Sequence, residues 1–141
     1  MSSALPPIAK AAERLLLEVE LGVRGFPRYH KYTLGSEIRG QAMSVVRLTH
    51  RAWRDRARQV EWTSKLAFAI DDLKLSLQLG KQVQAFKSFR QFELIAGLAV
   101  DLGRQCGGWS KHLKGQNART QASAQRPQIL SSQAASHEAR L

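Results

Sequence analysis

Cysteine is nearly absent from this sequence, and that scarcity limits how the fold can be stabilised. Cys106 is the only cysteine, so no disulfide can form within the chain. The four histidines lie far apart, and none has a second potential ligand at the spacing that a zinc site requires. We therefore expect no metal and no cofactor. Stability must come from an apolar core, which a hydrophobic share of 43% can supply.

Long hydrophobic runs and strand patterns are also missing. No segment approaches the roughly 20 apolar residues of a membrane span, and the first ten residues lack the charged and hydrophobic regions of a secretory signal. Sustained alternation of apolar and polar residues does not occur, nor do Asn-Gly or Asp-Gly turns. These absences predict an all-α protein that is cytoplasmic and does not bind membranes.

Acidic residues are scarce relative to basic ones. The chain of 141 residues has 11 Asp and Glu against 22 Lys and Arg, for a net charge of +11 and a pI near 10.7. Such a balance does not determine the fold, but it favours polyanionic partners such as nucleic acid, an anionic surface or an acidic protein. The charge is uneven, because residues 24–58 hold nine basic and two acidic residues.

Apolar residues recur at helical spacing in four segments. Proline before the first segment and Gly25 after it are typical of helix ends. Thr33 is placed to cap the second segment, and Ser88–Gln91 matches a capping box at the start of the fourth. The break after the second segment contains no Gly or Pro, and a change of phase places it near residues 59–61. The expected helices cover residues 8–23, 34–58, about 62–80 and 88–113.

Four helices with short connections predict an up-down-up-down four-helix bundle over residues 8–113, after an extension at residues 1–7. Residues 114–141 differ in composition: they are rich in Gln, Ala and Ser and contain no aromatic residue. Such a segment cannot bury enough apolar surface to offset its ordering entropy, so we expect a disordered tail. Its positive charges either add salt-sensitive affinity for a polyanion or serve only solubility.

The second helical segment carries two opposite stripes. One side is apolar and centred on Val45, whereas the other holds four arginines that fall within roughly 60° of one another: Arg47, Arg51, Arg54 and Arg58. Like charges four residues apart repel, and a face exposed only to water usually mixes signs. We therefore interpret this row as a binding face. A plain solvated face is the alternative, since arginine is a good helix former.

Aromatic residues near these arginines leave alternatives open. Residues 28–32 interleave Tyr29 and Tyr32 with basic side chains, including Arg28 and Lys31. Loops that bind nucleic acid use this mixture, because bases stack on rings while phosphates meet cations; otherwise the rings cover the end of the bundle. Two tryptophans flank the second connection and belong either to the core or to a subunit interface: Trp53 and Trp62.

Patterns typical of a catalyst are lacking. Asp71 and Asp72 are adjacent on a predicted helix and so point about 100° apart, which does not make an acid/base pair. Cys106 lies in an apolar seam, where a cysteine is usually an inert small hydrophobe. The sequence contains neither a phosphate-binding loop nor a G-x-S-x-G nucleophile elbow. We therefore expect a protein that is not an enzyme.

Two motifs resemble a known group of small helical proteins. Residues 26–38 read FPRYHKYTLGSEI. This resembles the aromatic-Thr-Leu-Gly-x-x-Ile entry into the second helix of the four-helix-bundle proteins encoded by ribosomal RNA intervening sequences, and of the accessory variability determinant (Avd) proteins of diversity-generating retroelements. Residues 103–109 read GRQCGGW, which resembles the ending of the fourth helix in Avd-like members. The similarity covers about residues 8–113.

The resemblance to Avd implies a fold, partners and a role. It implies a homopentameric barrel of four-helix bundles that binds a reverse transcriptase and its template-repeat and spacer RNA, supports mutagenic cDNA synthesis, and has no catalytic site. We assign the corresponding basic residues here by charge and geometry, because the contact residues form no fixed motif: Arg28, Lys31, Arg47, Arg51, Arg54 and Arg58. The alternative is a stand-alone bundle that acts as a protein-interaction scaffold without nucleic acid.

Overall fold

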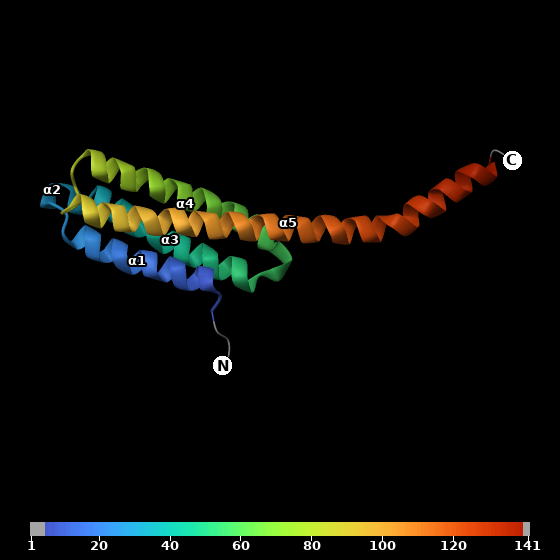
Figure 1. Ribbon diagram of the computed structural model, residues 1–141, viewed down its shortest axis with the longest axis horizontal. Coiled ribbons are helices and arrows are strands. Elements are labelled where there is room, and N and C mark those ends of the chain that lie inside the picture. The colour runs from blue at the N-terminus through green and yellow to red at the C-terminus, as the bar shows by residue number, and fades with distance from the viewer. Residues whose placement is uncertain (1–4, 140–141) are drawn as a thin grey trace. The chain divides into compact units, whose positions relative to one another are not determined.

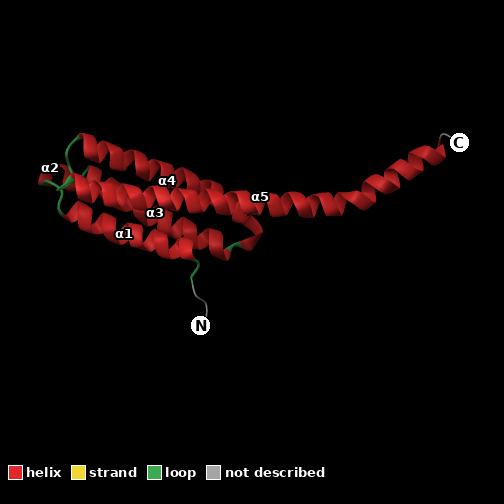
Figure 2. Ribbon diagram, in the orientation of Figure 1, coloured by secondary structure: helices red, strands yellow, loops and turns green. Residues whose placement is uncertain are grey.

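A computed structural model describes the backbone of residues 5–139 and the side chains of residues 5–123. All regular structure within this part is helical, and it contains no strand (Figure 2). The prediction of an all-α protein is therefore confirmed. The elements in chain order are α1 (Pro7–Arg24), α2 (Arg28–Lys31), α3 (Leu34–Arg54), the 3₁₀ helix η1 (Arg56–Arg58), α4 (Gln59–Gln82) and α5 (Phe89–Ala139).

One apolar core joins the four long helices. Figure 1 shows α1, α3, α4 and the first part of α5 lying alongside one another. Each contributes fully buried side chains at helical spacing, including Leu15 from α1, Ile38 and Val45 from α3, Leu73 from α4 and Ile95 from α5. Because each apolar stripe is removed from water only when the others pack against it, this core holds the opposite face of α3 toward solvent.

The end of α3 differs from the prediction. The helix ends at Arg54 rather than Arg58, and the next residue donates its backbone N–H to the Arg51 carbonyl oxygen at 2.9 Å. Arg58 therefore lies in η1, and α4 begins directly after it. Two side chains hold this early turn: Gln59 Nε2 donates to the Ala52 carbonyl oxygen at 3.0 Å, and Trp62 Nε1 donates to Asp55 Oδ2 at 3.0 Å.

The predicted caps are confirmed only in part. Ser88 Oγ accepts the backbone N–H of Gln91 at 3.1 Å, as a capping box requires, but the buried Gln91 Oε1 has no hydrogen-bond partner among the described residues. Thr33 does not cap α3 with its side chain, because its hydroxyl instead donates to the Tyr29 carbonyl oxygen at 3.3 Å. The segment before it forms the short helix α2 rather than an irregular connection.

The last helix is longer than expected. It continues to Ala139 instead of ending near Leu113, so residues 114–139 differ from the expected disordered tail. Gln, Ala, Lys and Arg in this segment favour helix locally, whereas Gly115 and Pro127 oppose it. Residues 114–123 are all exposed, in keeping with their lack of large apolar groups. The chain divides into two units at this helix, residues 1–110 and 111–141.

At the N-terminal end of the chain, α1 begins at Pro7, and residues 1–4 of the expected extension lie outside the described part.

Candidate nucleic-acid interface

The arginine row lies on the exposed face of α3, away from the core. Arg47, Arg51 and Arg54 are all exposed, and so is Arg58 in the neighbouring turn. None of the four forms an ion pair with a carboxylate of residues 5–123. Within the same range, the side chain of Arg47 donates to Ser44 Oγ alone, at 3.3 Å. The guanidinium groups are thus available to a partner, and their charge is not neutralised within this part of the chain.

Three of these arginines border one surface groove. The groove has a volume of about 590 Å³ and lies between the C-terminal half of α3 and the start of α4. Arg58 is not among its lining residues, because α3 ends before that position. The structure therefore brings three members of the predicted row to one concave site and places the fourth outside it. The lining residues are Val46, Arg47, His50, Arg51, Arg54, Asp55 and Trp62.

Trp62 forms an apolar wall of this groove. The indole is half-buried, and its only polar atom is engaged by Asp55. Arg51 places its guanidinium carbon 5.6 Å from the ring centroid, and Lys65 places Nζ 4.8 Å from it. These contacts are cation–π interactions, which attract a cation to the face of an indole. The sequence left open whether Trp62 belongs to the core or to a subunit interface, and the structure places it half-buried in the wall of the groove.

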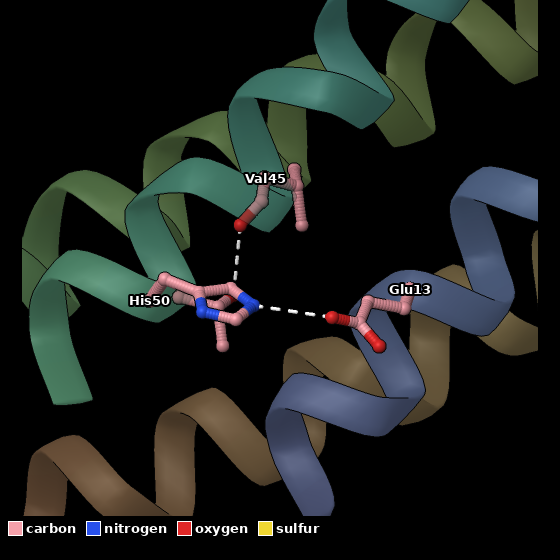
Figure 3. A network of polar contacts seen from close by, with 4 residues as sticks. Glu13, Val45 and His50 are labelled. Carbon is pink, nitrogen blue, oxygen red and sulfur yellow. Dashed lines mark hydrogen bonds and ion pairs between the residues drawn. The ribbon is translucent and has the colours of Figure 1, made fainter. Parts of the chain in front are cut away.

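His50 links the groove to α1. Its Nε2 lies 3.2 Å from Glu13 Oε1, and Figure 3 shows the two side chains facing each other across the α1–α3 contact. The hydroxyl of the neighbouring Thr49, fully buried, donates to the Val45 carbonyl oxygen at 2.7 Å. The first contact joins this turn of α3 to α1, whereas the second satisfies the buried hydroxyl of Thr49 within α3 itself. Sequence reasoning did not find the role of His50, because Glu13 is 37 residues away in the chain.

Arg28 and Lys31 lie at the opposite end of α3 from the groove. About 20 Å of helix separates the start of α3 from Arg47, so the structure does not bring these two residues to the arginine row. Arg28 is exposed. Lys31 is half-buried and lines a separate depression of about 300 Å³, together with residues of α1 and with Arg39. Their assignment to a binding surface stays a prediction.

Two tyrosines are turned to solvent here, Tyr29 within α2 and Tyr32 directly after it. Tyr29 is 84% exposed and Tyr32 is 70% exposed, so neither ring covers the end of the bundle. Phe26 fills that place instead, with its ring centroid 4.9 Å from that of Phe86.

Nearby, Arg39 donates to Glu20 Oε1 at 2.8 Å, and this hydrogen bond together with the carboxylate charge raises the pKa of Arg39.

Cys106 and Asp71, which the sequence offered as candidates for catalysis, make structural contacts instead. Cys106 is buried and donates to the Thr63 carbonyl oxygen at 3.5 Å. Burial, with a smaller contribution from the charge of Asp71, raises the pKa of its thiol to about 11. A thiol held neutral in this way is a poor nucleophile. Asp71 pairs with Lys74 at 3.5 Å. Among the described residues no three His, Cys, Asp or Glu side chains gather as metal ligands.

Comparisons with protein families, with curated proteins and with solved structures gave no match to this chain. Of the helices within residues 5–139, none combines the length and the apolar character that crossing a bilayer would require.

Proposed function

We propose that this protein is a nonenzymatic accessory factor that binds RNA, and with it a reverse transcriptase, through the arginine face of α3. In this role it supports synthesis of mutagenic cDNA from a template-repeat RNA, as the resemblance to Avd proteins implies. The protein would contribute binding and positioning, while the polymerase performs the chemistry. A neighbouring gene for a reverse transcriptase beside a pair of near-identical repeats would support the same role.

The observation that carries the proposal is the set of three unpaired guanidinium groups along one groove. Arg47, Arg51 and Arg54 are exposed, and they pair with no carboxylate of residues 5–123. Repulsion between like charges costs a few tenths of a kcal/mol for each such pair on an isolated helix, and a polyanion removes that cost. The planar fork of arginine also matches the oxygens of a phosphate.

The proposal includes an up-down-up-down bundle that assembles into a homopentameric barrel. Exposed apolar side chains support an assembly, because soluble monomers rarely expose extended apolar patches. On α4 they follow one face at steps of seven and four residues, at Phe68, Leu75 and Leu79. This surface is distinct from the arginine row of α3, so self-association would leave the basic groove available to RNA.

Charge reversal tests the RNA-binding role. Simultaneous Arg47→Glu, Arg51→Glu, Arg54→Glu and Arg58→Glu should leave the melting temperature nearly unchanged, because all four side chains are exposed. Fluorescence anisotropy with a labelled RNA should show affinity falling by at least about 100-fold at moderate salt. In a salt series the slope of log K against log salt should also become shallower, by about 0.7 for each phosphate of a single strand that the variant no longer neutralises.

A charge-matched variant controls for the change in overall charge. Four other exposed basic residues lie away from the groove, and their replacement by Glu alters net charge equally: Arg14, Lys87, Arg90 and Arg104. This control should keep most of the RNA affinity. Equal loss in both variants would show that only net charge matters and would refute the groove. Absence of RNA binding by the unmodified protein at about 0.15 M salt would instead favour a protein-interaction scaffold.

A further inference from the structure

We infer that the groove beside Trp62 holds an unpaired nucleotide, whose base packs on the indole while flanking phosphates pair with the arginines. This inference rests on the proposed RNA-binding function and specifies the class of ligand as single-stranded RNA. The groove offers both elements that such a nucleotide requires, since Trp62 lines it with an aromatic ring, and three arginines outnumber the one carboxylate of its lining, that of Asp55.

The indole is held in place while its ring remains accessible. Trp62 Nε1 donates to Asp55 Oδ2 at 3.0 Å, and this hydrogen bond fixes the orientation of the ring and satisfies its only polar atom. The cations that now lie near the ring belong to Arg51 and Lys65, both of which are exposed. Exposed side chains can turn toward a phosphate when a base takes their place on the ring.

The spacing of the arginines suits a phosphate backbone that runs along α3. Arg47 and Arg51 are separated by about 6 Å along the helix axis, and Arg51 and Arg54 by about 4.5 Å. Successive phosphates of an extended strand can therefore meet successive guanidinium groups. In a duplex, each base is already stacked between its neighbours and paired across the helix. An intact duplex can therefore reach the arginines but not the ring of Trp62.

An acidic peptide is the main competing ligand, and the groove favours it less. A planar indole beside guanidinium groups matches a planar aromatic ligand that carries phosphates. To occupy the groove equally well, a peptide would have to pack an apolar side chain of its own on Trp62 and place several carboxylates beside it, one for each of the three arginines. Arginine also binds phosphate oxygens through its two-pronged planar fork, which gives RNA a geometric match at each position.

Tryptophan fluorescence tests contact with the base directly. In the chain of 141 residues, Trp53→Phe together with Trp109→Phe leaves Trp62 as the only tryptophan. Titration with a 12-nucleotide single-stranded RNA should quench its emission, because a stacked base quenches an indole. A perfectly paired duplex of the same length should bind through phosphate contacts without comparable quenching. A purely structural Trp62 would give no difference between these two ligands.

Substitution of Trp62 measures the energetic contribution of stacking. Trp62→Leu keeps an apolar side chain without an aromatic ring, and affinity for the single-stranded 12-mer should fall roughly 5- to 100-fold. Affinity for the duplex should change less than about 2-fold. Trp53→Leu is the matched control, because Trp53 also lies near an arginine, with the Arg56 guanidinium carbon 5.9 Å from its ring, but does not line the groove. Thermal melting should show both variants folded.

The outcomes separate this inference from the proposed function. If charge reversal abolishes RNA binding while Trp62→Leu changes single-strand and duplex affinity equally, the RNA-binding role stands and the nucleotide site is refuted. If the unmodified protein binds no RNA, both fail together. If polyglutamate of similar length competes with RNA as strongly as unlabelled RNA does and quenches Trp62 equally, the groove belongs to an acidic peptide and the nucleotide site is again refuted.

Discussion

At the scale of single residues, burial decides what Cys106 can do. Its side chain lies in the apolar seam of α5, where the thiol donates to the Thr63 carbonyl oxygen. Moving a charged sulfur into this environment would cost solvation energy, and the pKa of the thiol is therefore raised from 9.0 to about 11. The residue contributes packing and a weak hydrogen bond, which is the role that its position in the sequence indicated.

The raised pKa of Cys106 predicts a pH dependence of stability. Below about pH 9 the thiol is neutral in the folded and the unfolded protein, and its contribution is complete. As pH rises from about 9 to 11, the unfolded chain loses the proton first, so the folded state loses stability. Over this range the melting temperature of the unmodified protein should fall more steeply than that of Cys106→Ser, measured by circular dichroism. Parallel curves for the two proteins would contradict this.

At the scale of elements, glycines in different helices have different surroundings. A Cβ added to Gly80, in the last turn of α4, would lie 2.8 Å from the ring of Phe86. Phe86 packs edge-on against both Phe26 and Phe92, so this ring has little freedom to move. Gly97 in α5 is exposed, and a Cβ there would meet no atom within 4 Å. The same substitution should therefore have opposite effects at the two positions.

We expect Gly80→Ala to lower the free energy of unfolding by about 1–3 kcal/mol, because overpacking against Phe86 exceeds the gain in helix propensity. Gly97→Ala should raise it by up to about 1 kcal/mol, since only the propensity gain applies. Urea denaturation followed at 222 nm measures both. Stabilisation by both substitutions would show that the ring of Phe86 moves aside readily and that the contact is not restrictive.

At the scale of the whole molecule, the exposed apolar face of α4 stands apart from the basic face of α3. Phe68 is 72% exposed and Leu75 is 61% exposed, although both are large apolar residues. Separate apolar and basic surfaces would let one chain associate with its copies and bind a polyanion at the same time. The exposed face supports self-association, and the number of five copies in the proposal comes from the resemblance to Avd proteins.

Light scattering coupled to size-exclusion chromatography tests that assembly. The unmodified protein should have five times the chain mass of 15.8 kDa. Phe68→Glu combined with Leu75→Glu should reduce the mass to that of a single chain without loss of helix content, because both side chains are exposed. Tyr29→Glu, which changes an exposed aromatic residue outside this face, should keep the assembly. A single-chain mass for the unmodified protein would refute the pentamer.

Much of the fold and part of the site could be predicted from the sequence because they depend on local periodicity. Helical spacing of apolar residues identified the all-α class and placed Val45 and Ile95 in the core. The same geometry placed Arg47, Arg51 and Arg54 opposite that core, where they are exposed. In each case the direction of a side chain follows from its position along one helix, so no knowledge of distant residues was needed.

Only the tertiary structure decided how those arginines become a site. Hydrogen bonds from Gln59 and Trp62 hold the turn between α3 and α4. Because α3 ends at Arg54, before this turn, Arg58 lies outside the arginine row. The contact of His50 with Glu13 joins residues on two helices, and the groove forms where α3 and α4 meet. These contacts join residues of different elements, seven positions apart across the α3–α4 turn and 37 positions apart between α1 and α3, whereas helical periodicity reports only on neighbours within one helix.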